Sequence, residues 1–402
     1  MNISRRNLLN AAVVGTAATT LPLSSANAHT PPNKAIHSSF DPWIEIRPDH
    51  VKHNIAEISR LVEGRPIMAV IKNNAYGMGI VNMGRILDDE ASVSGLAVVK
   101  LSEAIELRDA GVKKPILLMG TFDEKGLEEL IMRDITPMIY TPVGDALERI
   151  AAKKGTSVKI TICVDTGMGR VGVPFREAAD LIRDLASRPS IEIVSTMTGL
   201  NEIPDYEKMQ IARLRDIQSE LESDGISLGL IHAASSYSLF QSPYSYLDMV
   251  RPGMAIFGQY SSPKFKEQGL MDLKPTMALK ARVVYVKKLL KGESAGYEKA
   301  YTADKDTWIA TIPAGHVDGV PRAAANGGWV RIGDTNYPVI ASVSASHTLV
   351  EIGPEEAVKA GDEATFFDWR DGSRPEDASA ASGASVYDMI MHLNPTLPKR
   401  IV

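Results

Sequence analysis

The chain has 402 residues, a formal net charge of −5, 44% hydrophobic and 23% charged residues, and one cysteine. This balance is typical of a globular protein with room for more than one domain, and the mildly acidic charge gives no reason to expect nucleic acid or an anionic membrane as a partner. The single Cys163 excludes an intramolecular disulfide and a structural zinc site built from cysteines.

The first 28 residues, MNISRRNLLNAAVVGTAATTLPLSSANA, begin with a pair of arginines, continue through a modestly apolar stretch and end in small residues. This pattern predicts a twin-arginine export signal over residues 1–28, a leader to the mature protein over 29–40, and a periplasmic location. Polar residues interrupt the apolar stretch, so a stable membrane anchor is not expected. Loss of Arg5 and Arg6 with the signal changes the formal charge from −5 to −7.

Strand-like and helical patterns alternate after the leader. A short strand, WIEIR, precedes a helix whose apolar residues recur at helical spacing, Val51, Ile55, Ile58 and Val62. Eight strand-like apolar runs follow, at 66–72, 95–99, 115–120, 136–141, 157–164, 191–196, 229–233 and 248–257. Amphipathic stretches such as VGDALERIAAKK lie between many of them. Because parallel strands need helical crossovers, the alternation predicts an α/β fold with an N-terminal (β/α)8 barrel over residues 41–276.

From residue 277 the pattern changes to strand-like alternation without long helices. The strand-like segments are MALKARVVYVKKL, TWIATIPAG, WVRIGDTNYPVIASVSA, HTLVEIG and DEATFFD, and GDTN is a hairpin turn signal. Residues 277–402 are therefore predicted to form a C-terminal β-rich domain. Within it, RDGSRPEDASAASGAS at 370–385 has little apolar content and is predicted to be an exposed loop.

Polar residues follow the predicted barrel strands at their carboxyl ends, the rim where barrel enzymes carry their chemistry. They are Lys72, Tyr76, Asp165, Thr166, Arg170, Thr196, His232, Ser235, Ser236, Arg251 and Gly253. Lys72 is either the point where an apolar strand reaches water or an amine that attacks a carbonyl carbon, and a Schiff base with an aldehyde cofactor is the obvious use. Ser236 and Gly253 are placed to hold a phosphate with nearby backbone amides.

The lysine segment AVIKNNAYGMG resembles the cofactor-binding motif of alanine racemases, pyridoxal-phosphate enzymes of fold type III with an N-terminal barrel and a C-terminal β domain. The resemblance continues in the family's order through VDTGMGRVGV, DMVRPGMAIFG, AGYEKAYTADKD, IPAGHVDGVPRAAANGG and VSASHTLVEIG. It covers nearly the whole mature chain and implies pyridoxal 5'-phosphate as the cofactor. It also implies a homodimer with shared active sites, because in this family one catalytic tyrosine comes from the partner subunit.

Carried over residue by residue, the resemblance implies two catalytic bases, Lys72 and Tyr297. Lys72 would also hold the cofactor as an internal aldimine. The cofactor phosphate would be surrounded by Tyr76, Ser236, Gly253, Met254 and Tyr387, and Arg251 would contact the pyridine nitrogen. The substrate would contact Arg170, which also lies near the phenolic oxygen of the cofactor, and Ala345. No metal ligand is expected.

Several residues depart from the family's pattern. Cys163 stands where a lysine is often carbamylated to orient the arginine of VDTGMGR, so Arg170 must be held by another group. Cys163 itself is expected to be a small buried strand residue. Met197 and Ser235 replace a histidine packed on the cofactor ring and an asparagine before the phosphate serine. In the β domain, His316 replaces a tyrosine of the entrance corridor. The family's Ser-Met-Asp motif is replaced by Ser344, Ala345 and Ser346.

These replacements widen the expected substrate pocket and change its polarity, and export separates the protein from cytoplasmic cell-wall synthesis. The sequence therefore predicts an amino-acid racemase with a two-base mechanism. Its expected substrates are amino acids with larger side chains, basic ones included, and in this it resembles exported broad-specificity racemases. His316 and Asp318 are either selectors of the substrate or structural loop residues. Three alternatives stay open: an alanine racemase proper, a related decarboxylase, which usually carries a cysteine acid in its β domain, and a non-catalytic exported binder of pyridoxal phosphate.

Overall fold

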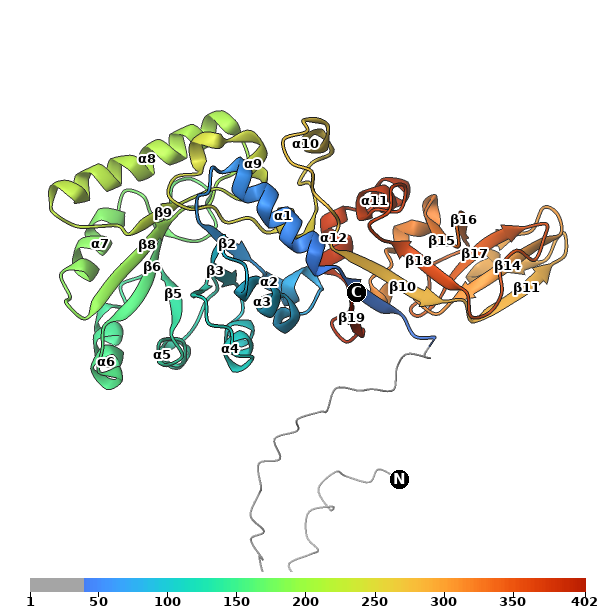
Figure 1. Ribbon diagram of the computed structural model, residues 1–402, viewed down its shortest axis with the longest axis horizontal. Coiled ribbons are helices and arrows are strands. Elements are labelled where there is room, and N and C mark those ends of the chain that lie inside the picture. The colour runs from blue at the N-terminus through green and yellow to red at the C-terminus, as the bar shows by residue number, and fades with distance from the viewer. Residues whose placement is uncertain (1–39) are drawn as a thin grey trace, which may run out of the picture. The chain divides into compact units, whose positions relative to one another are not determined.

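The computed structural model describes residues 40–402 (Figure 1). The predicted export signal at 1–28 and the predicted leader, apart from Phe40, lie outside the described residues. Across residues 40–402, no helix is both long enough and apolar enough to span a membrane. Two large sheets organise this part of the chain, one parallel and one mainly antiparallel.

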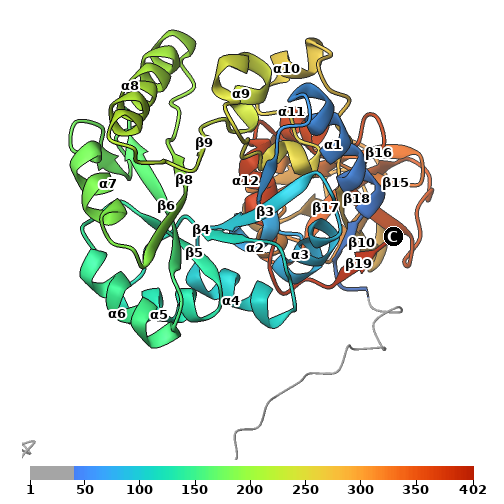
Figure 2. The same cartoon turned by 60° about the vertical axis from the view of Figure 1, so that its left-hand side comes forward.

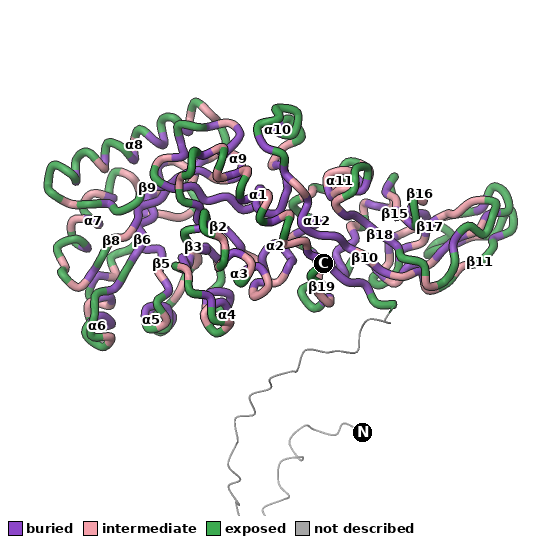
Figure 3. Tube along the Cα trace, viewed as in Figure 1, coloured by how far each residue is buried: buried purple, intermediate pink, exposed green. Residues whose placement is uncertain are grey.

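The parallel sheet forms the wall of a barrel. Its strands run in the order β2-β3-β4-β5-β6-β8-β9, and the short strand β7 pairs beside β6. Their bounds are β2 Ile67–Val70, β3 Val93–Val98, β4 Ile116–Leu118, β5 Ile135–Ile139, β6 Val158–Asp165, β7 Val173–Pro174, β8 Ile191–Met197 and β9 Leu230–His232. Most residues of these strands are buried (Figure 3), as expected when helices cover a parallel sheet. Seven of the eight predicted apolar runs overlap a strand of this sheet.

The segment 248–252 closes the barrel. The Met68 N–H donates to the carbonyl of Val250 at 2.9 Å, and on the other side the Asp248 N–H donates to a carbonyl of β9 at 3.0 Å. Parallel bridges join the segment to both neighbours. The predicted (β/α)8 barrel is therefore confirmed, although the run at 248–257 contributes a bridged segment and a turn of 3-10 helix rather than a full strand.

Helices cover the outer face of the barrel (Figure 2). The helical elements of residues 48–267 are α1 Pro48–Leu61, α2 Lys72–Tyr76, α3 Ile80–Asp88, α4 Leu101–Asp109, α5 Glu124–Met132, α6 Gly144–Lys154, α7 Ala178–Ala186, α8 Pro204–Ser223, α9 Ser236–Gln241, η1 Pro243–Ser245, η2 Met254–Phe257 and α10 Pro263–Glu267. In α1 the predicted apolar face is confirmed, because Val51, Ile55 and Ile58 are buried and Val62 is buried just beyond the helix.

The second sheet has nine strands in the order β11-β14-β17-β16-β15-β18-β10-β1-β19. Their bounds are β1 Trp43–Ile46, β10 Met277–Arg282, β11 Tyr285–Leu289, β14 Thr307–Ile312, β15 Trp329–Ile332, β16 Thr335–Ile340, β17 Thr348–Gly353, β18 Glu363–Phe367 and β19 Lys399–Ile401, and β12 Ser294–Ala295 pairs apart with β13 Tyr301–Thr302. Short helices lie among them, η3 Tyr297–Lys299, η4 His316–Asp318, η5 Arg322–Asn326, α11 Pro375–Ser382 and α12 Val386–Met391. The predicted β-rich domain is confirmed, and the GDTN turn joins β15 to β16.

The first strand belongs to the second sheet and not to the barrel. WIEIR lies in the segment predicted as barrel, 41–276, yet β1 pairs antiparallel with β10 and parallel with β19. Trp43, Ile44 and Ile46 are buried there. The sequence pattern predicts the strand itself but not the strands that pair with it, because both of these lie more than two hundred residues further along the chain.

The segment 370–385, predicted to be an exposed loop, contains the helix α11. Proline stands at its first position, and the Asp377 carboxylate accepts the Arg374 N–H at 2.9 Å. Gly383, with φ of 71°, ends the helix in a left-handed conformation. The start and stop signals were present in the sequence, but alanine and serine side chains gave no apolar periodicity to connect them.

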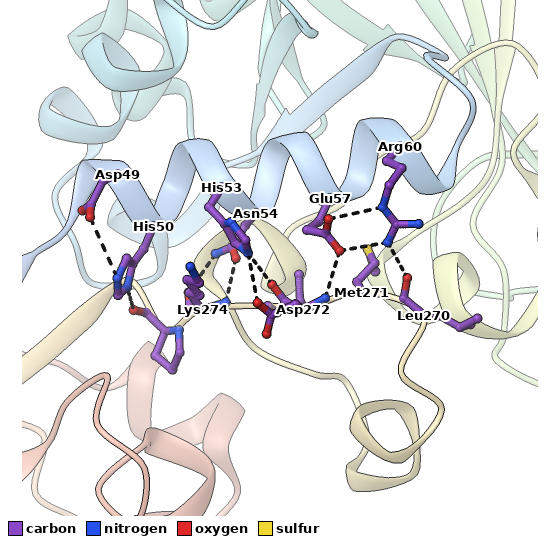
Figure 4. A network of polar contacts seen from close by, with 12 residues as sticks. Asp49, His50, His53, Asn54, Glu57, Arg60, Leu270, Met271, Asp272 and Lys274 are labelled. Carbon is purple, nitrogen blue, oxygen red and sulfur yellow. Dashed lines mark hydrogen bonds and ion pairs between the residues drawn. The ribbon is translucent and has the colours of Figure 1, made fainter.

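A polar network ties α1 to the segment that leads into β10 (Figure 4). Asn54 is fully buried. Its amide donates to the carbonyls of Ile256 at 3.1 Å and Lys274 at 2.8 Å, and its oxygen accepts the Lys274 N–H at 2.7 Å. The Glu57 carboxylate accepts the Asp272 N–H at 3.0 Å on the same side of the helix. One buried carboxamide therefore satisfies three backbone groups, one in η2 and two at Lys274.

Candidate active site

Lys72 lies at the carboxyl end of the barrel strand β2, as predicted. All four residues of β2 and Ile71 after it are buried, whereas Lys72 is partly exposed. Because the barrel strands are parallel, the loops after β6, β8 and β9 open onto the same rim. The amine therefore shares this rim with the other predicted site residues of the barrel.

The chain turns left-handed directly after Lys72. The φ angles are 54° at Asn73, 56° at Asn74, 52° at Ala75 and 53° at Tyr76. This conformation costs most L-residues about 1–2 kcal/mol each, and asparagine tolerates it best. The turn is therefore set by contacts with the rest of the fold and not by local preference.

Residues predicted at the phosphate meet beside this turn. Tyr76 is 3% exposed, and its ring lies edge-on to that of Tyr387, with 6.1 Å between ring centroids. The Ser236 hydroxyl oxygen accepts the Gly253 N–H at 2.9 Å. A Cβ on Gly253 would stand 2.2 Å from the Tyr76 hydroxyl oxygen. Met254 follows as the first residue of η2. The structure thus gathers all five residues in one cluster.

This cluster has the donor groups that a phosphate requires. Burial raises the pKa of Tyr76 well above its usual value, and the neighbouring Tyr387 adds to the effect. The phenol therefore keeps its proton and can donate it in a hydrogen bond. Gly253 has no side chain to crowd a ligand, and any Cβ there would fill the space next to the Tyr76 hydroxyl. These residues fit the phosphate of pyridoxal 5'-phosphate, with Lys72 four residues from Tyr76.

Arg251 lies next to the cluster and is almost completely buried, with 8% of its surface exposed. One terminal nitrogen donates to His232 Nδ1 at 2.8 Å, and the other donates to the Thr198 carbonyl at 2.7 Å. Burial lowers the pKa of Arg251 to about 10, and Arg170 adds to the effect. Burial also lowers the pKa of His232 well below its usual value, so this ring is neutral and accepts the hydrogen bond.

Cys163 and Met197 pair across β6 and β8, and both are buried. Burial raises the pKa of the Cys163 thiol to about 11, so the side chain is neutral. The expectation of a small buried strand residue is confirmed. Arg170 is exposed, and the described residues provide no ion pair for it. No carboxylate of residues 40–402 therefore replaces the missing carbamate.

Three further polar residues at the rim make structural contacts. The Asp165 carboxylate accepts the Gly167 N–H at 2.9 Å. The Thr166 hydroxyl lies 2.7 Å from that of Thr198, and the Thr196 hydroxyl donates to the Leu228 carbonyl at 2.9 Å. These bonds hold the loops that follow β6 and β8.

Tyr297 and Ala345 lie in a second group, in the β domain. Tyr297 is 76% exposed and lines an open hollow with Ser344 and His347. The His316 N–H donates to the Ser344 carbonyl at 3.0 Å, which joins the two loops that carry the predicted substrate residues. Ala345 is exposed in the second of these loops. No hydrogen bond or ring contact among residues 40–402 joins Tyr297 to Lys72, and Tyr297 has its lining neighbours in the β domain.

Two residues that contact the site received no role from the sequence. His232 was recognised as a rim residue, but its bond to Arg251 depends on side-chain geometry that spacing does not reveal. Glu103 was missed altogether, although it accepts the Asn74 N–H at 2.7 Å. A signal was present, because Glu103 stands one helical turn before Leu107, on the buried face of α4.

Comparison with known proteins agrees with this architecture. Residues 46–261 match the profile of the alanine racemase N-terminal domain, and residues 276–401 match that of the C-terminal domain. Alanine racemase from Desulforamulus reducens is 34% identical over 332 residues, which cover 81% of this chain and 89% of that protein. Alanine racemase from Treponema denticola is 33% identical over 366 residues, with coverages of 87% and 95%.

Solved structures show the same fold. Alanine racemase from Clostridium difficile superposes with a TM-score of 0.81 at 28% identity, over 88% of this chain and 93% of that one. Alanine racemase from a D-cycloserine-producing Streptomyces lavendulae gives a TM-score of 0.83 at 26% identity, over 90% and 97%.

A barrel with a lysine at the rim formed by the carboxyl ends of its strands, a neighbouring cluster that fits a phosphate, and an appended β domain agree with a pyridoxal-phosphate enzyme of fold type III. The chain belongs to the alanine racemase family. It is accordingly an amino-acid racemase, an isomerase that depends on pyridoxal 5'-phosphate.

Proposed function

We propose that this protein racemises amino acids with two bases, Lys72 and Tyr297, and that it accepts side chains larger than that of alanine. The observation that carries the wider specificity is the hollow of about 440 Å³ beside Tyr297. Apart from Leu349, its lining residues are small or carry polar groups, Gly296, Tyr297, Thr311, Ser342, Ser344 and His347. They offer space and hydrogen-bonding groups to a longer polar side chain.

In this proposal the two bases act on opposite faces of the substrate. Bound pyridoxal phosphate supplies the acidification of the α C–H bond. The Lys72 amine moves the proton on one face of the α carbon, and the Tyr297 hydroxyl moves it on the other, so that reprotonation inverts the configuration. Arg251 would contact the pyridine nitrogen of the bound cofactor, and it keeps its own proton at neutral pH because its pKa of about 10 lies above that range.

We propose further that the enzyme is a head-to-tail homodimer in which Tyr297 completes the site of the partner subunit. Two observations support this. Tyr297 is 76% exposed, although a catalytic phenol needs an enclosed site, and Val317, whose N–H donates to the Ala345 carbonyl at 3.1 Å, is 48% exposed. No hydrogen bond or ring contact of the described residues joins Tyr297 to Lys72. A two-fold dimer would complete two sites at once, each with Lys72 from one chain and Tyr297 from the other.

Subunit mixing tests the shared site. Lys72→Ala and Tyr297→Phe are each expected to be inactive, but co-expressed chains should recover about one quarter of the wild-type activity, because half of the dimers are mixed and each has one intact site. A co-expressed pair of Lys72→Ala chains under two different tags provides the control. Failure of the mixture to exceed its inactive components would show that both bases act within one chain.

The substrate is tested by incubating the purified enzyme with each of the twenty L-amino acids and separating the enantiomers by chiral chromatography. The proposal predicts D-product from larger, including basic, amino acids at rates that match or exceed that for alanine. Alanine is the second candidate, since the relatives reported above are named alanine racemases. Racemisation of alanine alone would refute the wider specificity.

The same screen separates the remaining alternatives. Release of an amine and carbon dioxide would indicate a decarboxylase, and absence of any turnover would indicate a non-catalytic binder. A cysteine acid in the β domain is unavailable for decarboxylation, because Cys163 lies in the barrel and is the only cysteine of the chain.

We also propose that the enzyme works in the periplasm. The paired Arg5 and Arg6 followed by an apolar stretch support export in the folded state. Cell fractionation is expected to place the wild type in the periplasm, and replacement of both arginines by lysine is expected to retain the protein in the cytoplasm. Equal distribution of the two forms would contradict export by this route.

A further inference from the structure

The turn that follows Lys72 needs support from outside. Ala75 and Tyr76 have φ angles of 52° and 53°, a conformation that side chains with a Cβ avoid. Within the turn, the Ala75 N–H donates to the Ile71 carbonyl at 3.0 Å, and the Asn74 side chain accepts the Ile80 N–H at 2.9 Å. The Asn74 N–H lies between the two predicted cofactor contacts Lys72 and Tyr76, and its partner comes from another element.

That partner is the carboxylate of Glu103 in α4. Its Oε1 accepts the Asn74 N–H at 2.7 Å. Glu103 is only 6% exposed, which is rare for a glutamate. The bond therefore joins a buried carboxyl group to the middle of the strained turn.

The second carboxylate oxygen makes the placement more unusual. Glu103 Oε2 is buried and has no hydrogen-bond partner among the described residues. A buried oxygen of this kind is unfavourable for folding, so an apolar side chain would suit the α4 face better if packing were the sole requirement. The one hydrogen bond from this carboxyl group to the turn therefore points to a use other than packing.

We propose that Glu103 is a positioning residue, which fixes the left-handed turn through the Asn74 N–H and so presents Lys72 and Tyr76 to pyridoxal phosphate. The inference rests on the proposed function, because it assumes that Lys72 forms the covalent link to the cofactor. Glu103 does not touch the reacting atoms. Its loss should let the turn relax, which moves the amine away from the aldehyde and the phenol away from the phosphate.

Borohydride trapping at saturating pyridoxal phosphate, followed by peptide mass mapping, measures how fast Lys72 captures the cofactor. Glu103→Leu should slow trapping at Lys72 about tenfold, as expected for the loss of one hydrogen bond. Glu103→Gln keeps an acceptor oxygen and should stay close to the wild type. The matched control is Glu106→Leu, an exposed residue on the same helix. Unfolding midpoints are recorded in parallel.

A second-site variant distinguishes positioning from packing. Glycine adopts positive φ freely, so Ala75→Gly should restore trapping in Glu103→Leu, whereas a packing defect would be worsened by loss of another buried methyl group. If Glu103→Leu does not fold, the trapping rates of Glu103→Gln and of the double variant Glu103→Leu/Ala75→Gly test the inference instead. Trapping at wild-type rates in Glu103→Leu, or no rescue by Ala75→Gly, overturns the inference. A wild type without label at Lys72 would instead overturn the proposed function.

Discussion

Replacement of Gly253 by alanine tests the packing of the phosphate cluster. On the present backbone the added Cβ would lie 2.2 Å from the Tyr76 hydroxyl oxygen and 3.0 Å from the ring carbon that bears it. The ring has little freedom to move, because it packs on Phe257 with 4.6 Å between centroids and lies edge-on to Tyr387 at 6.1 Å. The backbone at residue 253 or the tyrosine ring must therefore shift.

The expected cost has two parts. Overpacking of a buried site typically costs about 1–3 kcal/mol. A shift of the backbone also weakens the bond from the Gly253 N–H to the Ser236 hydroxyl, a bond worth about 1 kcal/mol. The free energy of unfolding should thus fall by about 2–4 kcal/mol, as the sum of these two terms. Tyr76→Phe removes the closest atom, so the double variant should be about 1–2 kcal/mol more stable than additivity predicts.

Urea unfolding of the wild type, Gly253→Ala, Tyr76→Phe and the double variant measures the coupling energy between residues 253 and 76. Titration of the same proteins with pyridoxal phosphate measures how the substitutions change its affinity. Gly199→Ala is the matched control for stability, because a Cβ there would meet nothing closer than 3.7 Å. Additive losses in the double variant, or a Gly253→Ala protein as stable as the control, would refute the contact between Gly253 and Tyr76.

Three further predictions concern titration, the connection to β10 and the cradle. Burial lowers the pKa of His232 below 6.5. On acidification below pH 6.5, the imidazole is therefore protonated in the unfolded state while it stays neutral in the folded state. The free energy of unfolding should therefore fall by about 1.4 kcal/mol per pH unit below 6.5, and urea unfolding of His232→Gln should lose this contribution. Asn54→Ala leaves three backbone groups unpaired and should destabilise the protein by about 2–4 kcal/mol in the same assay, whereas a loss below 1 kcal/mol would contradict that role. Tyr387→Phe should weaken binding of pyridoxal phosphate about tenfold without a change in unfolding, and unchanged affinity would remove Tyr387 from the cradle.

Sequence patterns predicted the elements whose signals are local. The barrel runs, the apolar face of α1 and the GDTN turn depend on periodicity and turn chemistry within a few residues. The partners of β1 could not be predicted in this way, because pairing with β10 and β19 is decided by long-range packing. The helix α11 was missed since its small side chains show no amphipathic pattern, although Pro375 and Gly383 marked its ends.

The candidate site shows the same division. Lys72, Tyr76, Ser236, Arg251 and Gly253 follow barrel strands, so topology alone places them on one rim. The bonds that orient them were not accessible from the sequence. The left-handed turn after Lys72 and its contact with Glu103 depend on how α4 packs, which no motif encodes.

The central claim is that Lys72 and Tyr297 exchange the α proton from opposite faces. It is tested most directly by following deuterium incorporation in deuterated water, starting from each pure enantiomer of a substrate. The wild type should give a product of inverted configuration with deuterium at the α carbon. Lys72→Ala should exchange neither enantiomer, and Tyr297→Phe should lose proton removal from the L form while it still binds pyridoxal phosphate. Full exchange of the L form by Tyr297→Phe would contradict the two-base account.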